Sequence, residues 1–123
     1  MNVRCLIVDD NRSFLRAART LLEREGLTIA GVATSSGEAL QATDTLLPEV
    51  VLVDVSLGEE SGFELARRLV DGQAHPGPTV ILISTRPEAD LADLVALSPA
   101  AGFLSKSELS ADAIRSFLDG SGG

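Results

Sequence analysis

The stretch Val50-Val51-Leu52-Val53-Asp54 places four consecutive apolar residues, three of them β-branched, directly before a carboxylate. A run of this length, with Pro48 just upstream, predicts a short strand that is buried on both faces, as in a parallel sheet. Asp54 then lies at the carboxyl end of that strand, where open α/β sheets place their ligand crevice. The run therefore predicts both the fold class and the position of a functional site.

Three other apolar runs along the chain also end in polar residues. If the corresponding strands are parallel neighbours, their carboxyl ends meet at one edge of a single sheet. We therefore expect three carboxylates, several hydroxyls and one ammonium to converge at that edge. The runs and the residues that follow them are Leu6 to Val8 with Asp9 and Asp10, Val80 to Ile83 with Ser84 and Thr85, and Phe103-Leu104 with Ser105 and Lys106.

Between these runs the apolar residues recur at helical spacing, as Phe14, Leu15, Ala18, Leu21 and Leu22 do after Asn11. Ser-x-x-Glu or Thr-x-x-Glu capping boxes precede three of the helices. Five β-strand and α-helix units in alternation predict an α/β fold, a five-stranded parallel sheet with helices on both faces. We expect one domain over residues 1–119, a turn-rich connection at 71–78 and a flexible Gly/Ser tail at 120–123. Strands are expected at 3–8, 27–33, 50–53, 79–83 and 101–104. Helices are expected from Asn11 until Gly26 stops the helix, from Ser35 to about Leu47, from Ser61 to about Val70, from Thr85 to just before Ser98, and from Ser110 to about Leu118.

The bulk composition narrows the classes of function. The net charge of −8 repels nucleic-acid backbones and anionic membranes, and 3% aromatic residues leave no stacking surface for single strands. Cys5, the one cysteine, is predicted to be a buried strand thiol, so a disulfide within the chain is impossible. No apolar run approaches the roughly 20 residues that span a bilayer. These features predict a cytoplasmic protein.

The expected cluster of side chains has a specific chemistry. Asp9 and Asp10, with Asp54 from a neighbouring strand, repel one another unless one is protonated or a cation binds. Oxygen ligands alone suit a hard ion such as Mg²⁺. Lys106 adds a fixed positive charge, and Ser84 adds a hydroxyl that can rotate to meet an anion. Together these groups are what phosphoryl transfer to an aspartate requires, and the absence of a glycine-rich nucleotide loop excludes ATP bound here as the donor.

Residues 3–118 resemble the receiver domain of two-component response regulators. That family has an acidic pair after its first strand, a phosphoacceptor Asp after the third, Ser or Thr after the fourth and Lys after the fifth. Ser84 lies 30 positions after Asp54 (84 − 54) and Lys106 lies 52 after it (106 − 54), which is the family's spacing. The resemblance implies a flavodoxin-like fold with strand order 2-1-3-4-5.

By this resemblance Asp54 is the phosphoacceptor, and Ser84 and Lys106 grip the phosphoryl group. Phe103 occupies the aromatic position that turns inward in family members when the phosphoryl group draws the hydroxyl toward it. Phosphorylation then biases a two-state equilibrium and reshapes the face formed by the fourth helix, fifth strand and fifth helix. Ser84 and Phe103 are thus the implied switch residues.

The same resemblance assigns a magnesium site. Asp10 binds Mg²⁺ directly and Asp9 largely through water. Asp54 and the backbone carbonyl of Ser56 complete the implied ligand set. The implied cofactor is therefore Mg²⁺ alone.

The sequence departs from the family's pattern at three positions. Gly58 and Ser107 stand where proline is usual, and Phe103 stands where tyrosine is frequent. The alternatives that remain are a pseudo-receiver, which binds partners without phosphate, and a receiver cut from a DNA-binding regulator. An aspartyl-phosphate phosphatase is excluded because it needs an acid two residues after the nucleophile, and that residue is Ser56.

The resemblance also implies the partners. We expect a stand-alone response regulator that takes phosphate from a histidine kinase or phosphotransfer protein and then binds a downstream protein target. It is not an enzyme beyond its own Mg²⁺-dependent phosphotransfer and dephosphorylation. The region of the fourth helix carries Glu88, Asp90 and Asp93 and no basic residue after Arg86, which favours a monomer or weak dimer over a charge-paired dimer.

Overall fold

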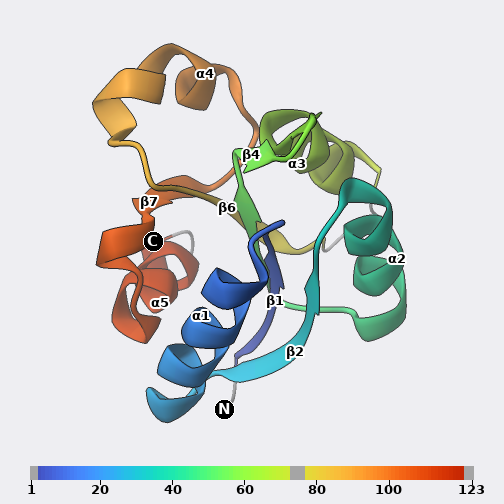
Figure 1. Ribbon diagram of the computed structural model, residues 1–123, viewed down its shortest axis with the longest axis vertical. Coiled ribbons are helices and arrows are strands. Elements are labelled where there is room, and N and C mark those ends of the chain that lie inside the picture. Colours follow the sequence, from blue (N-terminus) through green and yellow to red (C-terminus); the bar gives the residue numbers. More distant parts are fainter. Residues whose placement is uncertain (1–2, 73–76, 121–123) are drawn as a thin grey trace.

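The structure, a computed structural model, describes residues 3–72 and 77–120. Strands and helices alternate along the chain (Figure 1). The main strands are β1 (Arg4–Val8), β2 (Thr28–Ala33), β3 (Val50–Asp54), β6 (Thr79–Ser84) and β7 (Gly102–Ser105). The helices are α1 (Arg12–Arg24), α2 (Ser36–Leu46), α3 (Gly62–Asp71), α4 (Ala92–Leu97) and α5 (Ala111–Gly120), and the short elements are β4 (Ser56–Leu57), β5 (Glu60–Ser61) and the 3₁₀ helices η1 (Glu88–Leu91) and η2 (Lys106–Glu108).

The five main strands form one parallel sheet in the order β2-β1-β3-β6-β7. This order confirms the predicted 2-1-3-4-5 arrangement, in which β6 and β7 are the fourth and fifth strands. Helices α1 and α5 cover one face of the sheet, and α2 and α3 cover the other (Figure 1). The fold is therefore the predicted doubly covered α/β sheet.

The alternation of side chains along each strand divides the core into two layers. Val50 and Leu52 of β3 pack with residues of α1 and α5, whereas Val51 and Val53 pack with residues of α2 and α3. All four side chains are fully buried. The continuous apolar run was thus a correct indicator of a strand with no solvent-facing side.

Cys5 lies in the first of these layers and is fully buried. Burial raises the pKa of its thiol to about 12. The predicted role of Cys5 as an inert apolar side chain is therefore confirmed.

Two of the three predicted capping boxes supply their cap. The hydroxyls of Ser35 and Ser61 accept hydrogen bonds from the backbone N–H of Glu38 and Glu64. The third box, at Thr85, was a wrong prediction: Pro87 is the N-cap of η1, its backbone is extended, and no side chain caps it. The segment consequently begins with a 3₁₀ turn, and the α-helical part is the short α4.

A small hairpin lies between the predicted strand at 50–53 and α3. Strands β4 and β5 pair antiparallel, with Ser56 opposite Ser61 and Leu57 opposite Glu60. Gly58 is the first of the two turn residues and has a φ of +65°, a value that proline cannot adopt. The family's usual proline is therefore incompatible with the turn observed in this chain.

The ends of the predicted segments need two qualifications. Helix α5 continues to Gly120, two residues past the predicted helix end at Leu118 and into the segment expected as a Gly/Ser tail. Residues 121–123 of that tail, and residues 73–76 of the turn-rich connection, lie outside the described residues. None of the helices in the described part of the chain has the length and apolar character needed to cross a membrane.

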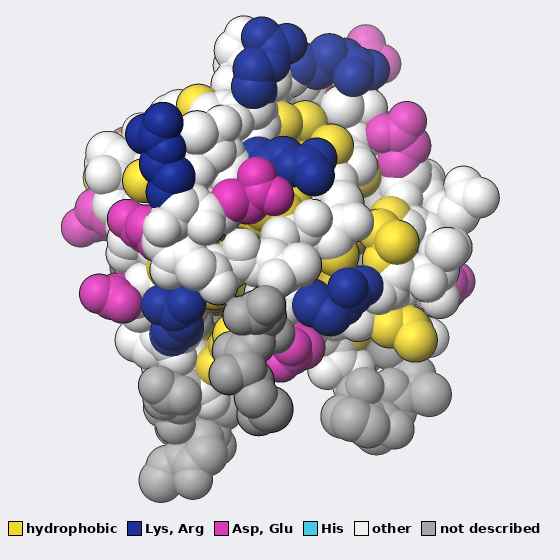
Figure 2. Space-filling model, turned by 90° about the horizontal axis from the view of Figure 1, so that it is seen from below, with side chains coloured by type: hydrophobic (Ala, Val, Ile, Leu, Met, Phe, Trp, Pro, Cys, Tyr) yellow, Lys and Arg dark blue, Asp and Glu magenta, His cyan; other side chains and the backbone are white. Residues whose placement is uncertain are grey.

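The molecular surface mixes charges of both signs. On the face seen in Figure 2, the described Lys and Arg side chains stand singly or in small groups, separated by acidic and neutral side chains. The chain as a whole carries a net charge of −8. This face is thus unlike the continuous basic surface that nucleic-acid binding requires.

Gly62, the first residue of α3, allows the helix to pack against the backbone that follows β3. A Cβ atom at Gly62 would lie 1.8 Å from the carbonyl oxygen of Asp54. A Cβ atom at Gly37, in α2, would meet nothing within 4 Å. Only the first of these two glycines is therefore required by close packing.

We predict that Gly62→Ala lowers the free energy of unfolding by about 3 kcal/mol, because the backbone beside Asp54 must shift. The matched variant Gly37→Ala should be neutral or stabilise by up to about 1 kcal/mol through helix propensity. Urea unfolding followed by circular dichroism measures both. Equal stability of the two variants would contradict the close packing described for Gly62.

Candidate functional site

The register of the sheet brings the predicted polar residues to one edge. Val8 of β1 pairs with Val53 of β3, so Asp9 and Asp54 follow side by side. Asp54 in turn pairs with Ile83 of β6, which places Ser84 one residue further along the next strand. These side chains line a cleft of about 340 Å³ at the carboxyl ends of the strands.

Asp54 lies at the centre of this cleft and is only 7% exposed. Its Oδ1 accepts a hydrogen bond from the backbone N–H of Ser56 at 3.0 Å, and its Oδ2 lies 3.0 Å from Nζ of Lys106. Burial raises the pKa of the Asp54 carboxyl, while the Ser56 N–H and Lys106 act in the opposite direction. Both oxygens are therefore fixed in orientation before any ligand arrives.

Lys106, the first residue of η2, reaches from β7 over the ends of β6 and β3. Its ammonium forms ion pairs with Oδ2 of Asp9 and Oδ2 of Asp54. Burial acts to lower the pKa of Lys106, but its contacts with the two carboxylates outweigh this and the pKa is raised. Nζ also lies 4.2 Å from the centroid of the Phe14 ring. The ammonium is thus held charged between two strands and α1.

The acidic cluster fits a divalent cation. Carboxylate oxygens of Asp9, Asp10 and Asp54 lie within 4.8 Å of one another. When all three are ionised, they exceed the single positive charge of Lys106 by two negative charges. Oδ2 of Asp9 is buried, and although it contacts Lys106 it accepts no hydrogen bond of good geometry. The charge excess, the oxygen donors and this unsatisfied atom are all suited to Mg²⁺.

Ser84 supplies the hydroxyl of the site from the end of β6. It is 3% exposed, and its Oγ accepts a hydrogen bond from the backbone N–H of Arg86 at 3.0 Å. That bond uses a lone pair of the oxygen and leaves the hydroxyl hydrogen to donate elsewhere. Ser84 is therefore set to donate to an anion that enters the cleft.

The cleft contains all but one of the residues that the sequence singled out for chemistry. The exception is Phe103, which is 8% exposed and packs in the core layer beneath α2 and α3. Two contributors were not anticipated, namely Phe14, which was assigned only to the apolar face of its helix, and the positive φ of Gly58. The six predicted residues that line the cleft are Asp9, Asp10, Asp54, Ser56, Ser84 and Lys106.

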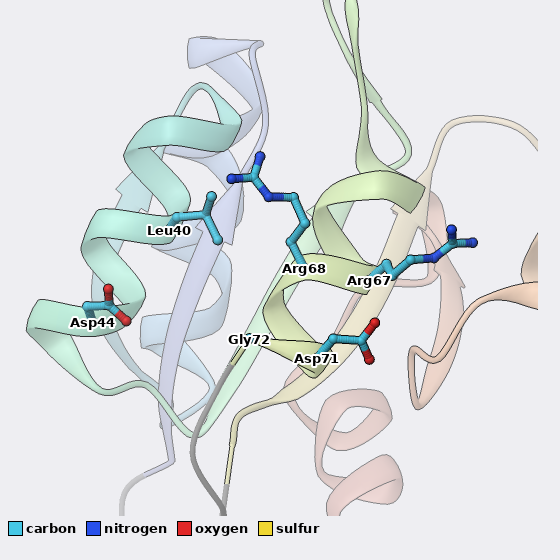
Figure 3. A pocket seen from close by; sticks show the side chains of 6 residues that line it. All are labelled: Leu40, Asp44, Arg67, Arg68, Asp71 and Gly72. Atoms are coloured by element: carbon cyan, nitrogen blue, oxygen red, sulfur yellow. The ribbon is translucent and has the colours of Figure 1, made fainter.

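A larger hollow of about 460 Å³ lies between α2 and α3, away from this cleft. Figure 3 shows that the side chain of Arg68 extends toward Leu40 of α2, whereas Arg67 extends to the other side of α3. The two guanidinium groups of this hollow therefore point away from each other. A site for chemistry needs convergent groups, which the cleft at the strand ends supplies.

Comparison with known proteins agrees with the geometry of the cleft. Residues 5–118 match the family model for the response regulator receiver domain. The chain is 32% identical over 106 residues to response regulator GacA of Pseudomonas viridiflava, covering 85% of this chain and 48% of GacA. It is 30% identical over 103 residues to the DNA-binding transcriptional activator EvgA of Escherichia coli K12, covering 84% of this chain and 50% of EvgA. The chain thus spans about half the length of the curated relatives it matches.

Among solved structures, a response regulator protein from Burkholderia pseudomallei matches with a TM-score of 0.78 and 26% identity. The match covers 95% of this chain and 66% of that protein, which was crystallised with a phosphorylated aspartic acid, a calcium ion and citrate. The family match covers nearly the whole chain, and the fold and site geometry agree with it. This chain therefore belongs to the response regulator receiver domain family.

Proposed function

We propose that this domain accepts a phosphoryl group on Asp54 in a Mg²⁺-dependent reaction, and that the phosphorylated form signals by binding a partner protein. The observation that carries the proposal is the convergence, in one cleft, of a central carboxylate with two further carboxylates, a hydroxyl and an ammonium. Each of these groups has a distinct part in phosphoryl transfer to an aspartate.

In the transfer step, a carboxylate oxygen of Asp54 forms a bond to phosphorus while the bond between phosphorus and the donor's leaving atom breaks. The electron pair of the broken bond departs with the donor. Lys106, already 3.0 Å from Oδ2 of Asp54, turns to a phosphoryl oxygen, and the Ser84 hydroxyl donates to another. The Ser56 N–H holds the other oxygen of Asp54 in place.

Asp9, Asp10, Asp54 and the backbone carbonyl of Ser56 are the residues that would hold Mg²⁺. When bound, the ion supplies positive charge that offsets the negative charge of the carboxylates and of the phosphoryl oxygens. Asp9 is held in orientation by the backbone N–H of Asn11, which donates to its Oδ1 at 2.8 Å.

In this proposal the phosphoryl donor and the downstream target are both proteins. The sequence has no glycine-rich nucleotide loop, so the phosphoryl group does not come from ATP bound to this domain. In this proposal a histidine kinase or phosphotransfer protein supplies it in the cytoplasm. Ser84 and Phe103 relay the change to the face formed by α4, β7 and α5. Leu94 and Leu97 of α4 are 50% and 76% exposed, which suits contact with a downstream protein.

The length of the relatives favours the alternative in which this receiver is part of a longer, DNA-binding regulator. GacA and EvgA are each about twice as long as the matched region, and EvgA is described as DNA-binding. A receiver joined to a DNA-binding output domain would use the same phosphoryl chemistry. That the protein is a stand-alone regulator, and that it is a monomer or weak dimer, remain predictions. The pseudo-receiver, which would bind partners without phosphate, remains an alternative.

We predict that a small acyl phosphate adds one phosphoryl group to the folded protein only when Mg²⁺ is present, and that Asp54→Asn abolishes the adduct. The reason is that an asparagine side chain keeps the shape of the aspartate but removes its negative charge and nucleophilicity. Intact-mass spectrometry measures the adduct. Asp112→Asn, at a side chain that is 99% exposed, is the matched control and should be phosphorylated as the wild type is. An unchanged adduct in Asp54→Asn would contradict the proposal.

We predict that Lys106→Met lowers the free energy of unfolding by about 3–5 kcal/mol at neutral pH, because it leaves the fully buried Asp9 without a counter-charge. Saturating Mg²⁺ should restore part of this loss, since the ion binds only the folded site. Urea unfolding with and without Mg²⁺ measures both effects.

Arg19→Met is the matched control for this experiment. It breaks the ion pair of Arg19 with Glu23, in which the two side chains are 50% and 47% exposed, and should cost only about 0.3–0.5 kcal/mol with no response to Mg²⁺. A Lys106→Met protein as stable as the wild type would show that Lys106 does not neutralise this site.

A further inference from the structure

The ring of Phe14 lies against the ammonium of Lys106, with Nζ 4.2 Å from the ring centroid. An aromatic face attracts a cation at distances up to about 6 Å. The sequence assigned Phe14 only to the apolar side of its helix, so this contact gives the residue a second role. It brings α1 into contact with the site.

The fold fixes the ring in this position from two sides. Phe14 is in the first turn of α1, and its backbone N–H donates to Oδ1 of the N-cap residue Asn11 at 3.1 Å. The backbone N–H of Asn11 donates in turn to Asp9. The ring also packs against the core layer that α1 and α5 share. The position of Phe14 is thus coupled to one of the two carboxylates that hold Lys106.

The ring differs from the other neighbours of the ammonium. Asp9 and Asp54 bind Lys106 as ion pairs, whereas the ring offers attraction without a hydrogen-bond acceptor or a full charge. The Lys106 side chain is only 13% exposed. A neighbour of this kind restricts the ammonium and excludes water while leaving its N–H groups to the oxygens of the site.

We propose that Phe14 is a positioning residue, which holds the Lys106 ammonium at the acidic cluster and shields it from water. The inference rests on the proposed function, because it matters for phosphoryl transfer only if Lys106 turns to the phosphoryl group. Its geometric part concerns the unphosphorylated protein and can be tested separately.

Lys106 is the single lysine of the chain, which makes the test specific. Protein made with ¹³C,¹⁵N-labelled lysine gives one set of side-chain NMR signals. The variants are Phe14→Leu, which keeps an apolar side chain but removes the aromatic face, and Phe14→Tyr, which keeps the face. Phe117→Leu is the matched control, because Phe117 packs on the same core layer and its ring lies over Gly102.

We expect slow exchange of the Lys106 ammonium hydrogens with water in the wild type, Phe14→Tyr and Phe117→Leu, and faster exchange in Phe14→Leu. The Hε protons of Lys106 should also lose their ring-current shift only in Phe14→Leu. A purely structural role of Phe14 predicts no such difference between the Leu variants at positions 14 and 117. Exchange in the wild type as fast as in free lysine, or unchanged in Phe14→Leu, would overturn the proposal.

The kinetic arm uses a small acyl phosphate with Mg²⁺. We expect the maximal phosphorylation rate to fall about threefold to tenfold in Phe14→Leu, with the half-saturating Mg²⁺ concentration unchanged, and to recover in Phe14→Tyr. A rate in Phe14→Leu equal to that of the wild type would overturn the positioning role. If no variant, the wild type included, takes up phosphate, the proposed function fails, and the NMR comparison still decides whether the ring holds Lys106.

Discussion

One ammonium group, that of Lys106, joins two carboxylates that the sheet brings together at its edge. Asp9 is fully buried and Asp54 is 7% exposed, so the repulsion between them is poorly screened by water. The parallel register of β1 and β3 makes this closeness unavoidable, because it aligns the residues that follow both strands. The site therefore depends on positive charge: Lys106 supplies part of it, and the remaining negative excess suits a divalent cation.

The sequence predicted most of this arrangement because the relevant signals are local. The run from Val50 to Val53 has no polar residue, which is typical of a strand covered on both faces, and the structure buries all four side chains. Ser35 and Ser61 correctly predicted the starts of two helices, because each hydroxyl accepts a hydrogen bond from the backbone N–H three residues ahead. Asp54 could be placed at the functional edge because it ends a buried strand. The same local reasoning failed at Thr85, where Pro87 is extended and a 3₁₀ turn follows.

The features that were missed arise from contacts between distant segments or from backbone angles. No spacing rule relates Phe14 to Lys106, because their contact requires α1 and the segment after β7 to lie on the same face of the sheet. The turn at Gly58 depends on pairing between β4 and β5, each only two residues long, and strands so short leave no periodicity to detect. The physical need for Gly62 became visible only from the 1.8 Å approach of a Cβ atom at that position to the Asp54 carbonyl oxygen.

The central claim is that Asp54 alone among the clustered carboxylates is the phosphoacceptor. It is tested most directly by phosphorylating the wild-type protein with a small acyl phosphate, reducing it with borohydride and mapping the product by peptide mass spectrometry. Borohydride transfers a first hydride to the acyl phosphate carbon, which releases phosphate and leaves an aldehyde, and a second hydride reduces the aldehyde to an alcohol. A phosphorylated aspartate therefore becomes homoserine. The account predicts homoserine at position 54 and unaltered aspartate at positions 9 and 10. Homoserine at either of the other positions, or at none in the folded protein, would contradict it.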